Sequence, residues 1–83
     1  MALIIIKTAG KELRTLPKQD AERLLTRLEA IAAAPSSRHP ATTEMVGQPG
    51  FWRVRQGDWR AIFEIANGDV VVIKIGHRGE VYK

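Results

Sequence analysis

Residues 51–65 read FWRVRQGDWRAIFEI, and polar and apolar side chains alternate on both sides of the turn signal Gln-Gly-Asp at residues 56–58. Alternation with a period of two sends successive side chains to opposite faces of a β-sheet. One face is therefore expected to carry Arg53, Arg55 and Arg60. The other face carries the apolar set: Trp52, Val54, Trp59, Ala61, Phe63 and Ile65. Such a sheet packs on one side and offers guanidinium groups to a polyanion, most naturally phosphate, on the other.

A second turn signal, Asn-Gly-Asp at residues 67–69, precedes a run of Val and Ile. Three antiparallel strands are therefore expected near residues 51–56, 59–66 and 69–76. At the amino end, residues 3–7 form a short β-branched run that is typical of a strand.

Helical patterns lie between this first strand and the three later ones. Residues 11–16 can make one or two helical turns, with Leu13 and Leu16 facing inward. A longer amphipathic helix is expected from Pro17 to the Pro-Ser-Ser stretch at residues 35–37. Residues 35–50 have the composition of a loop, with room for one helical turn near residues 44–46. The predicted fold class is α+β with the order β-α-α-β-β-β: the N-terminal strand joins an antiparallel C-terminal meander, and both helices pack on one face.

The length of the first hairpin turn determines which arginines face each other. A two-residue loop at residues 56–57 predicts that Arg53 lies opposite Arg60. Like charges directly opposed in a sheet are destabilising, so this pairing suggests that an anion lies between them.

The second turn determines the face on which Lys74 lies. A strict two-residue Asn-Gly loop would turn Lys74 toward the core. A three-residue loop with a glycine bulge instead places Lys74 beside Ile62 on the arginine face and leaves Val71, Ile73 and Ile75 buried. We favour the bulge, because burying an unpaired ammonium group is unfavourable.

Composition limits the class of protein. The chain has 83 residues, a net charge of +4 and a pI near 10.0, so a single domain over residues 1–83 with acidic partners is expected. It has no cysteine, and its histidines and carboxylates show no metal-ligand spacing, so no metal and no cofactor are expected. The apolar run at residues 2–6 is too short for a signal peptide or a membrane span. These features favour a cytoplasmic protein that does not associate with membranes.

The motifs along the whole chain resemble the RelE/ParE superfamily of bacterial and archaeal toxins. The resemblance includes the opening strand, KELRTLP at residues 11–17, the long helix and the glycine-to-arginine segment at residues 47–55. Its most specific parts are GDWRAIF at residues 57–63 and GHRGEVY at residues 76–82. The resemblance implies the toxin of a type II toxin–antitoxin system, closest to the RelE-like mRNA interferase branch.

Two branches of this superfamily differ in their activity. RelE-like toxins cut mRNA on the ribosome, whereas ParE-like toxins poison DNA gyrase without nuclease chemistry. The basic and aromatic positions of RelE-like enzymes are matched here by Arg53, Arg55, Arg60, Arg78 and Tyr82. The resemblance thus implies a ribosome-dependent, metal-independent endoribonuclease with these catalytic residues. The alternatives are a ParE-like gyrase inhibitor and a degenerate toxin that acts as a co-repressor with its antitoxin.

The resemblance also suggests a role for each residue. Arg60 is assigned to the scissile phosphate, with Arg53 and Arg55 on it and on neighbouring phosphates, because guanidinium groups clamp phosphate oxygens and neutralise charge in the transition state. Arg78 is assigned to the leaving group, as an electrostatic stabiliser or proton donor, and Tyr82 could orient the 2′-hydroxyl, stack on a base or act as the catalytic base. The set expected to bind RNA is Arg53, Arg55, Lys74 and His77. The expected partners are a cognate antitoxin, mRNA and ribosomal RNA, with operator DNA reached only through the antitoxin.

Overall fold

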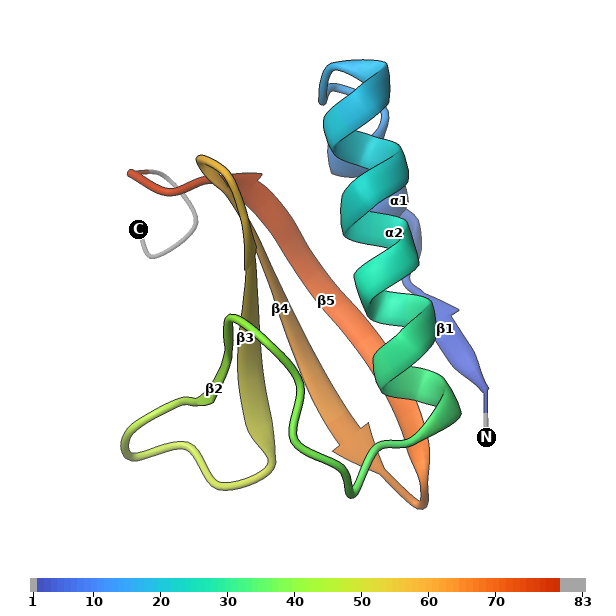
Figure 1. The fold of residues 1–83 in the computed structure, drawn as a ribbon, viewed down its shortest axis with the longest axis vertical. Helices are drawn as coiled ribbons and strands as arrows, with labels where there is room; N and C mark the ends of the chain where they lie inside the picture. The colour runs from blue at the N-terminus through green and yellow to red at the C-terminus, as the bar shows by residue number, and fades with distance from the viewer. Residues whose placement is uncertain (1, 80–83) are drawn as a thin grey trace.

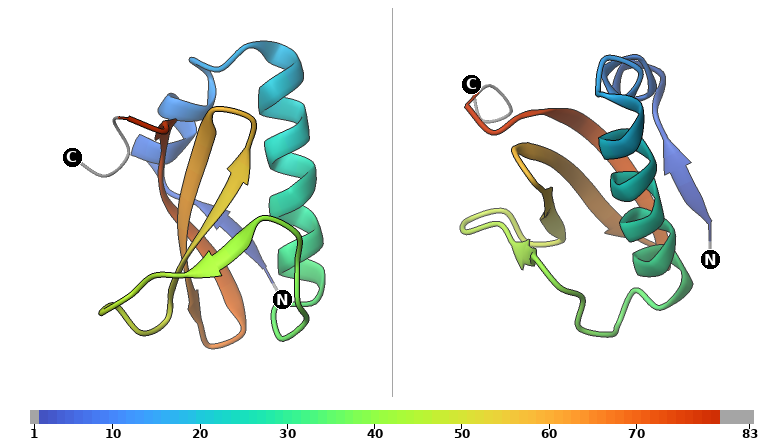
Figure 2. Two further views of the ribbon diagram at one scale, coloured as in Figure 1. Left: turned by 60° about the vertical axis from the view of Figure 1, so that its left-hand side comes forward. Right: turned by 45° about the horizontal axis from the view of Figure 1, so that its top comes forward.

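Two helices and five strands make up residues 2–79, the part of the chain that the computed structural model describes (Figure 1). In chain order the elements are β1 (Leu3–Ile5), α1 (Lys7–Leu13), α2 (Lys18–Ala33), β2 (Thr42–Glu44), β3 (Phe51–Gln56), β4 (Trp59–Ala66) and β5 (Asp69–His77). The strands form one sheet in the order β1-β5-β4-β3-β2. β1 runs parallel to β5, and the other neighbours are antiparallel. Both helices lie on one side of the sheet, which confirms the predicted α+β class (Figures 1 and 2).

α2 forms because its sequence places a narrow apolar stripe on one side of a helix. Pro17 occupies the N-cap, where its missing N–H is not needed, and the helix ends at Ala33, two residues before Pro35. Leu24, Leu28 and Ile31 recur at helical spacing and are almost completely buried. Burying each such side chain stabilises the fold by about 1.5–3 kcal/mol, so α2 is held mainly by its contact with the sheet.

The core lies between the helices and the sheet. Its strand residues include Val54, Ala61 and Phe63, each with no exposed surface. The predicted apolar face is confirmed, with Trp52, Trp59 and Ile65 half-buried at its margins.

Two local elements differ from the prediction. α1 begins at Lys7, earlier than expected, and contains Gly10, because burial of Ala9 in the core outweighs the weak helix propensity of glycine. The helical turn expected near residues 44–46 is wrong: residues 42–44 form strand β2, which pairs with β3 so that Thr42 lies opposite Val54. None of the helices within residues 2–79 is long and apolar enough to cross a membrane.

The β4–β5 turn is shorter than predicted. Asn67 and Gly68 have φ values of 54° and 81°, and Ala66 lies opposite Asp69, as in a two-residue turn with positive φ at both central positions. The predicted three-residue loop is therefore wrong.

The bulge lies farther along, between the pairs Ile62–Lys74 and Phe63–Val72, so Ile73 is the extra residue of β5. As predicted, it places Lys74 beside Ile62 and keeps Ile75 buried. Val71 and Ile73, which were expected to be buried, are only half-buried, and the core takes Val70 and Val72 instead.

Candidate functional site on the open face of the sheet

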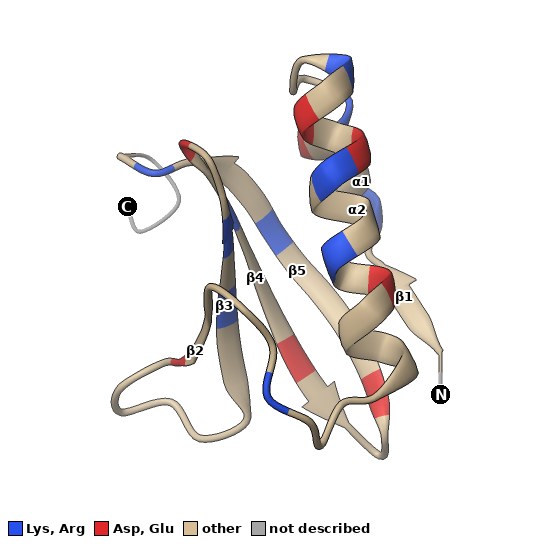
Figure 3. Ribbon diagram, in the orientation of Figure 1, with Lys and Arg blue, Asp and Glu red and all other residues tan. Residues whose placement is uncertain are grey.

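The face of the sheet away from the helices, called the open face below, carries the basic side chains of the three central strands. Arg55 lies opposite Arg60, and Arg53 lies opposite Ile62, which in turn lies opposite Lys74. Figure 3 shows Lys and Arg on β3 and on the middle of β5. The expected pairing of Arg53 with Arg60 is wrong, because Arg60 pairs with Arg55, two residues farther along β3.

The first hairpin turn explains that difference. The turn is Gly57-Asp58 rather than residues 56–57, since Gln56 lies opposite Trp59 and Gly57 has a φ of 59°. Glycine adopts this left-handed backbone without the penalty that a Cβ atom brings. The turn therefore places two arginines, Arg55 and Arg60, directly across from each other.

A cavity of about 330 Å³ opens between these arginines and β2. The residues that line it are Ala41, Thr43, Arg53, Arg55 and Arg60. Arg53 and Arg55 are exposed and Arg60 is half-buried, so the cavity is open to solvent and bordered by three guanidinium groups. Planar guanidinium groups match the geometry of phosphate oxygens, and the arrangement suits an anion.

The Arg60 side chain is anchored at the turn. Its Nη1 donates hydrogen bonds to the carbonyl oxygens of Gly57 at 3.0 Å and Trp59 at 3.2 Å. A guanidinium group has five N–H donors, so Nη2 and Nε keep donors for a ligand. Arg60 can therefore hold an oxyanion without giving up the contacts that orient it.

Arg78 follows β5 and reaches the same turn. Its backbone N–H donates to the carbonyl oxygen of Asp58 at 2.8 Å, next to the Gly57 carbonyl that binds Arg60. The backbone of Arg78 is thus fixed at the turn end of the open face, and its side chain is exposed.

Of the expected site residues that the structure describes, Lys74 and His77 lie apart from this group. Lys74 is on the open face opposite Ile62 but lines a different cavity, together with Gly76 and His77. His77 lies opposite Trp59, and the two rings meet edge to face, with centroids 5.5 Å apart and an interplanar angle of 88°. His77 therefore belongs to the helix side of the sheet and is absent from the arginine-lined cavity. Tyr82 lies outside the described residues.

β2 supplies a wall that sequence reasoning missed. Thr43 of β2 and the preceding Ala41 line the cavity, and the Ala41 carbonyl accepts a hydrogen bond from the Arg55 N–H at 3.0 Å. Ala41 has a φ of 55°, an uncommon conformation for a residue with a side chain. The three polar residues of β2 show no apolar alternation, so only their backbone pairing with β3 reveals the wall.

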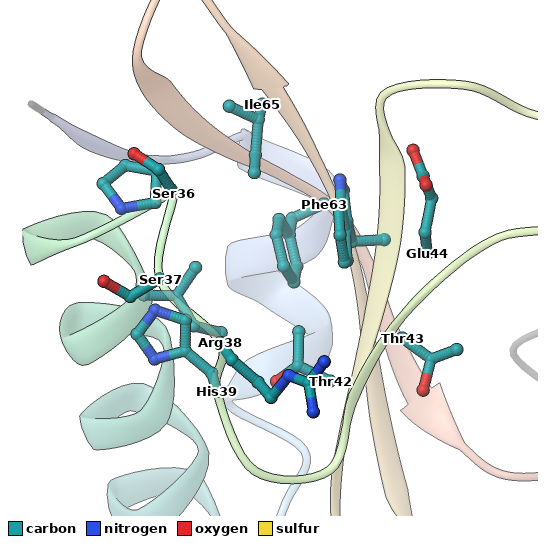
Figure 4. Close-up of a pocket in the computed structure, with 12 residues that line it drawn as sticks. Ser36, Ser37, Arg38, His39, Thr42, Thr43, Glu44, Phe63 and Ile65 are labelled. Atoms are coloured by element: carbon teal, nitrogen blue, oxygen red, sulfur yellow. The ribbon is translucent and has the colours of Figure 1, made fainter.

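A larger cavity of about 620 Å³ lies on the helix side, between the end of α2, the loop after it and the sheet (Figure 4). Its apolar lining includes Ile31, Phe63 and Ile65, and Ser36, Ser37 and His39 lie around it. Arg38 is the one Lys or Arg among the described residues that line it. Within residues 2–79, no group of three or more His, Cys, Asp or Glu side chains is arranged to hold a metal ion. The cationic cluster is thus a feature of the open face.

Comparisons with known proteins identify relatives of this fold. The isolated RelE toxin of E. coli matches with 25% identity and a TM-score of 0.79, over 98% of this chain and 89% of that chain. A chain of the RelE–RelB complex of Pyrococcus horikoshii matches with 25% identity and a TM-score of 0.79, over 95% and 96% of the two chains. A chain of the RelB–RelE antitoxin–toxin complex of Methanococcus jannaschii matches with 20% identity and a TM-score of 0.81, over 95% and 94%.

A protein-family model, but no individual curated protein, matches this sequence. The family model described as the ParE toxin of the type II toxin–antitoxin system parDE matches residues 3–82, almost the entire sequence. The chain therefore belongs to the ParE toxin family of type II toxin–antitoxin systems, within the RelE/ParE superfamily.

Proposed function

We propose that this toxin is a ribosome-dependent endoribonuclease that cleaves mRNA during translation, and that its RNA-binding site is the arginine-lined cavity of the open face. The observation that carries the proposal is the meeting of Arg53, Arg55 and Arg60 around one solvent-open cavity. Binding a phosphodiester there would exchange repulsion between like charges for charge-assisted hydrogen bonds.

The chemistry of RNA cleavage gives these residues distinct tasks. The 2′-hydroxyl must lose its proton to a base and attack phosphorus, the resulting phosphorane must be stabilised, and the departing 5′-oxygen must gain a proton. We assign the phosphorane to Arg60, because its Nη1 is already fixed to the turn and its other donors need little reorganisation. Arg53 and Arg55 hold the scissile and neighbouring phosphates.

Arg78 and Tyr82 complete the proposal. The backbone bond from Arg78 to Asp58 keeps Arg78 at the turn that also anchors Arg60, so the two can act on one phosphodiester. We assign Arg78 to stabilising or protonating the leaving oxygen, and Tyr82 to orienting or deprotonating the 2′-hydroxyl. Lys74, on the same face, provides a further phosphate contact.

The residues that line the cavity explain why the ribosome would be required. Those that the structure describes comprise arginines, one threonine and one alanine, and an arginine side chain gives up its proton only with difficulty. The protein thus contributes charge and orientation more than proton transfer. Holding the RNA in a reactive geometry supplies much of a rate enhancement, and the ribosome can provide that geometry.

A cognate antitoxin is the proposed protein partner. The M. jannaschii and P. horikoshii relatives are complexes of RelE with RelB, and the E. coli toxin is also known in an intact RelBE complex. The charge of the open face suits an antitoxin segment that is acidic and partly apolar. We place the toxin and its antitoxin in the cytoplasm, where they would meet translating ribosomes.

The test uses purified ribosomes translating a defined message, with new RNA ends mapped by primer extension. The wild-type toxin should produce cuts within codons, and Arg60→Ala should reduce their rate of formation by about 10²–10³-fold. Arg23→Ala is the matched control, because Arg23 is an exposed arginine on α2, away from the open face. Cleavage by Arg60→Ala at the rate of the wild type and of Arg23→Ala would contradict the proposed site.

The family description favours one other function, because it names ParE. In this alternative the toxin poisons DNA gyrase and leaves RNA intact. Incubating the toxin with gyrase and supercoiled DNA, then denaturing the protein, would reveal gyrase-linked DNA breaks. Such breaks together with intact mRNA would replace the nuclease proposal. Intact RNA and intact DNA, with tighter operator binding by the antitoxin, would indicate a co-repressor.

A further inference from the structure

Among residues 2–79, no strand lies beside part of the outer edge of β5. β1 covers β5 only from Val70 to Val72, and the last backbone bond of this pair runs from the Ile6 N–H to the Val72 carbonyl at 3.2 Å. Beyond that point the chain turns into α1. Within the described residues, the second half of β5 is therefore paired on its β4 side alone.

A carboxylate from α1 bonds to the part of the β5 edge that β1 does not cover. Oε1 of Glu12 accepts a hydrogen bond from the Ile75 N–H at 3.0 Å, across 63 positions of sequence. The Glu12 backbone is itself fixed, because its carbonyl accepts bonds from Thr15 Oγ1 at 2.7 Å and from the Thr15 N–H at 3.0 Å. Hydrogen bonds to ionised groups are stronger than those between neutral groups, so this contact is a firm anchor.

Ile75, the residue bonded to Glu12, lies close to the bulge. Ile73 is the extra residue, and a bulge disrupts the local ladder of backbone bonds. Two positions past Ile73, Ile75 is almost completely buried and is bonded to Glu12. Lys74 lies between them on the open face, and the strand continues to His77, the residue before Arg78.

We propose that Glu12 is a positioning residue for the open face. By bonding to the uncovered edge of β5, it fixes the position, relative to Arg60, of the segment that carries Lys74 and leads to Arg78. This inference rests on the proposed RNA cleavage for its functional consequence. Its structural part, the anchoring of β5 by a side chain of α1, does not require any particular activity.

The surroundings of Glu12 indicate that its loss would shift the strand rather than unfold the protein. Glu12 is half-buried and lines a cavity of about 560 Å³ together with Lys74, Gly76 and His77. Water can therefore reach the Ile75 N–H when the carboxylate is removed, and the donor does not remain unsatisfied. A hydrated edge next to a bulge holds its position less tightly than an anchored one.

Three variants separate the possible roles of this residue. Glu12→Ala removes the acceptor, Glu12→Gln keeps an acceptor oxygen at the same reach without the charge, and Glu29→Ala removes an exposed carboxylate from α2 as the control. The single-turnover cleavage rate at saturating toxin should fall about tenfold for Glu12→Ala, since small misplacements of catalytic groups have effects of this order or larger. Ribosome affinity should change by less than about threefold, and Glu12→Gln should restore most of the rate.

Amide hydrogen exchange measured by NMR gives a readout that does not depend on nuclease activity. The Ile75 amide should exchange faster in Glu12→Ala than in the wild type and the Glu29→Ala control, while the Phe63 amide should be unchanged. Equal Ile75 exchange in Glu12→Ala and wild type would overturn the anchor, as would equal loss of cleavage in Glu12→Ala and Glu12→Gln. If the wild type cuts no RNA but Ile75 exchange responds as expected, the anchor stands and the nuclease proposal fails.

Discussion

The helix-covered face and the open face consist of alternate residues of the same strands, yet they differ in burial and in charge. Val54 and Ala61 have no exposed surface, whereas their sequence neighbours Arg53 and Arg55 are exposed and Arg60 is half-buried. Adjacent strand residues point to opposite faces, so either face can be changed with little direct effect on the other. Stability and activity should therefore separate by alternate positions along β3 and β4.

The largest effect is expected from the helix-covered face. Phe63 is the largest fully buried side chain, and Phe63→Ala should lower the free energy of unfolding by about 3–5 kcal/mol through lost burial and a cavity. Denaturant unfolding followed by tryptophan fluorescence would measure the change. Glu64→Ala, at the next residue along β4, is the control and should change the free energy by less than about 1 kcal/mol. Equal losses of unfolding free energy in the two variants would contradict the expectation that the helix-covered face determines stability.

On the open face, the largest expected effect is on catalysis. Arg60→Ala should reduce the single-turnover rate of mRNA cleavage by about 10²–10³-fold, which is typical for loss of one preorganised donor to a transition-state oxyanion. The free energy of unfolding should change by less than about 1 kcal/mol, because only two bonds to turn carbonyls are lost.

A second variant at this position tests the geometry of the donor. Arg60→Lys keeps the positive charge but loses the planar fork, so its rate should lie between those of Arg60→Ala and the wild type. A rate equal to that of the wild type would indicate a general attraction for phosphate in place of an oriented clamp.

The two faces could be predicted from sequence because alternation is a local property. Each residue of β3 and β4 takes its side from its immediate neighbours, and the assignment of Arg53, Phe63 and the residues between them was correct. β2 could not be predicted in this way. Its residues are polar, and it forms because its backbone pairs with β3, a contact that no local pattern encodes.

Register was harder to predict than the faces because it depends on single-residue choices. A turn at residues 56–57 and one at residues 57–58 both contain Gly57, yet they pair different arginines. The sequence also does not indicate the position of the bulge. Ile73 lies in a run of similar β-branched residues, and no local feature distinguishes it from Val71 or Val72 as the extra residue. The contacts of the whole sheet decide between such alternatives.

A medium effect is expected from adding a side chain opposite Arg60. Gly76 lies opposite Arg60 in the β4–β5 ladder, so a side chain at residue 76 would project onto the open face next to the Arg60 guanidinium group. Gly76→Val should lower cleavage by about tenfold, with Gly76→Ala in between, because misplacing the phosphate slightly costs rate. The unfolding midpoint should stay constant or rise, since β-branched residues favour strands. Full activity in Gly76→Val would place the RNA elsewhere on this face.

The smallest effect should distinguish the two faces most clearly, because it has opposite signs for stability and for activity. Arg55 and Arg60 are directly opposed like charges, so Arg55→Gln should raise the free energy of unfolding of the isolated toxin by about 0.2–1 kcal/mol. The gain should shrink in 1 M salt, where the screening length is about 3 Å instead of about 10 Å at 0.1 M. RNA binding should weaken in the same variant, through one lost phosphate contact.

Arg38→Gln, which removes an equal charge from the exposed loop after α2, controls for net charge. If Arg55→Gln destabilised the toxin as well as weakening RNA binding, Arg55 would be part of the scaffold, and the separation between the faces would fail at the centre of the site.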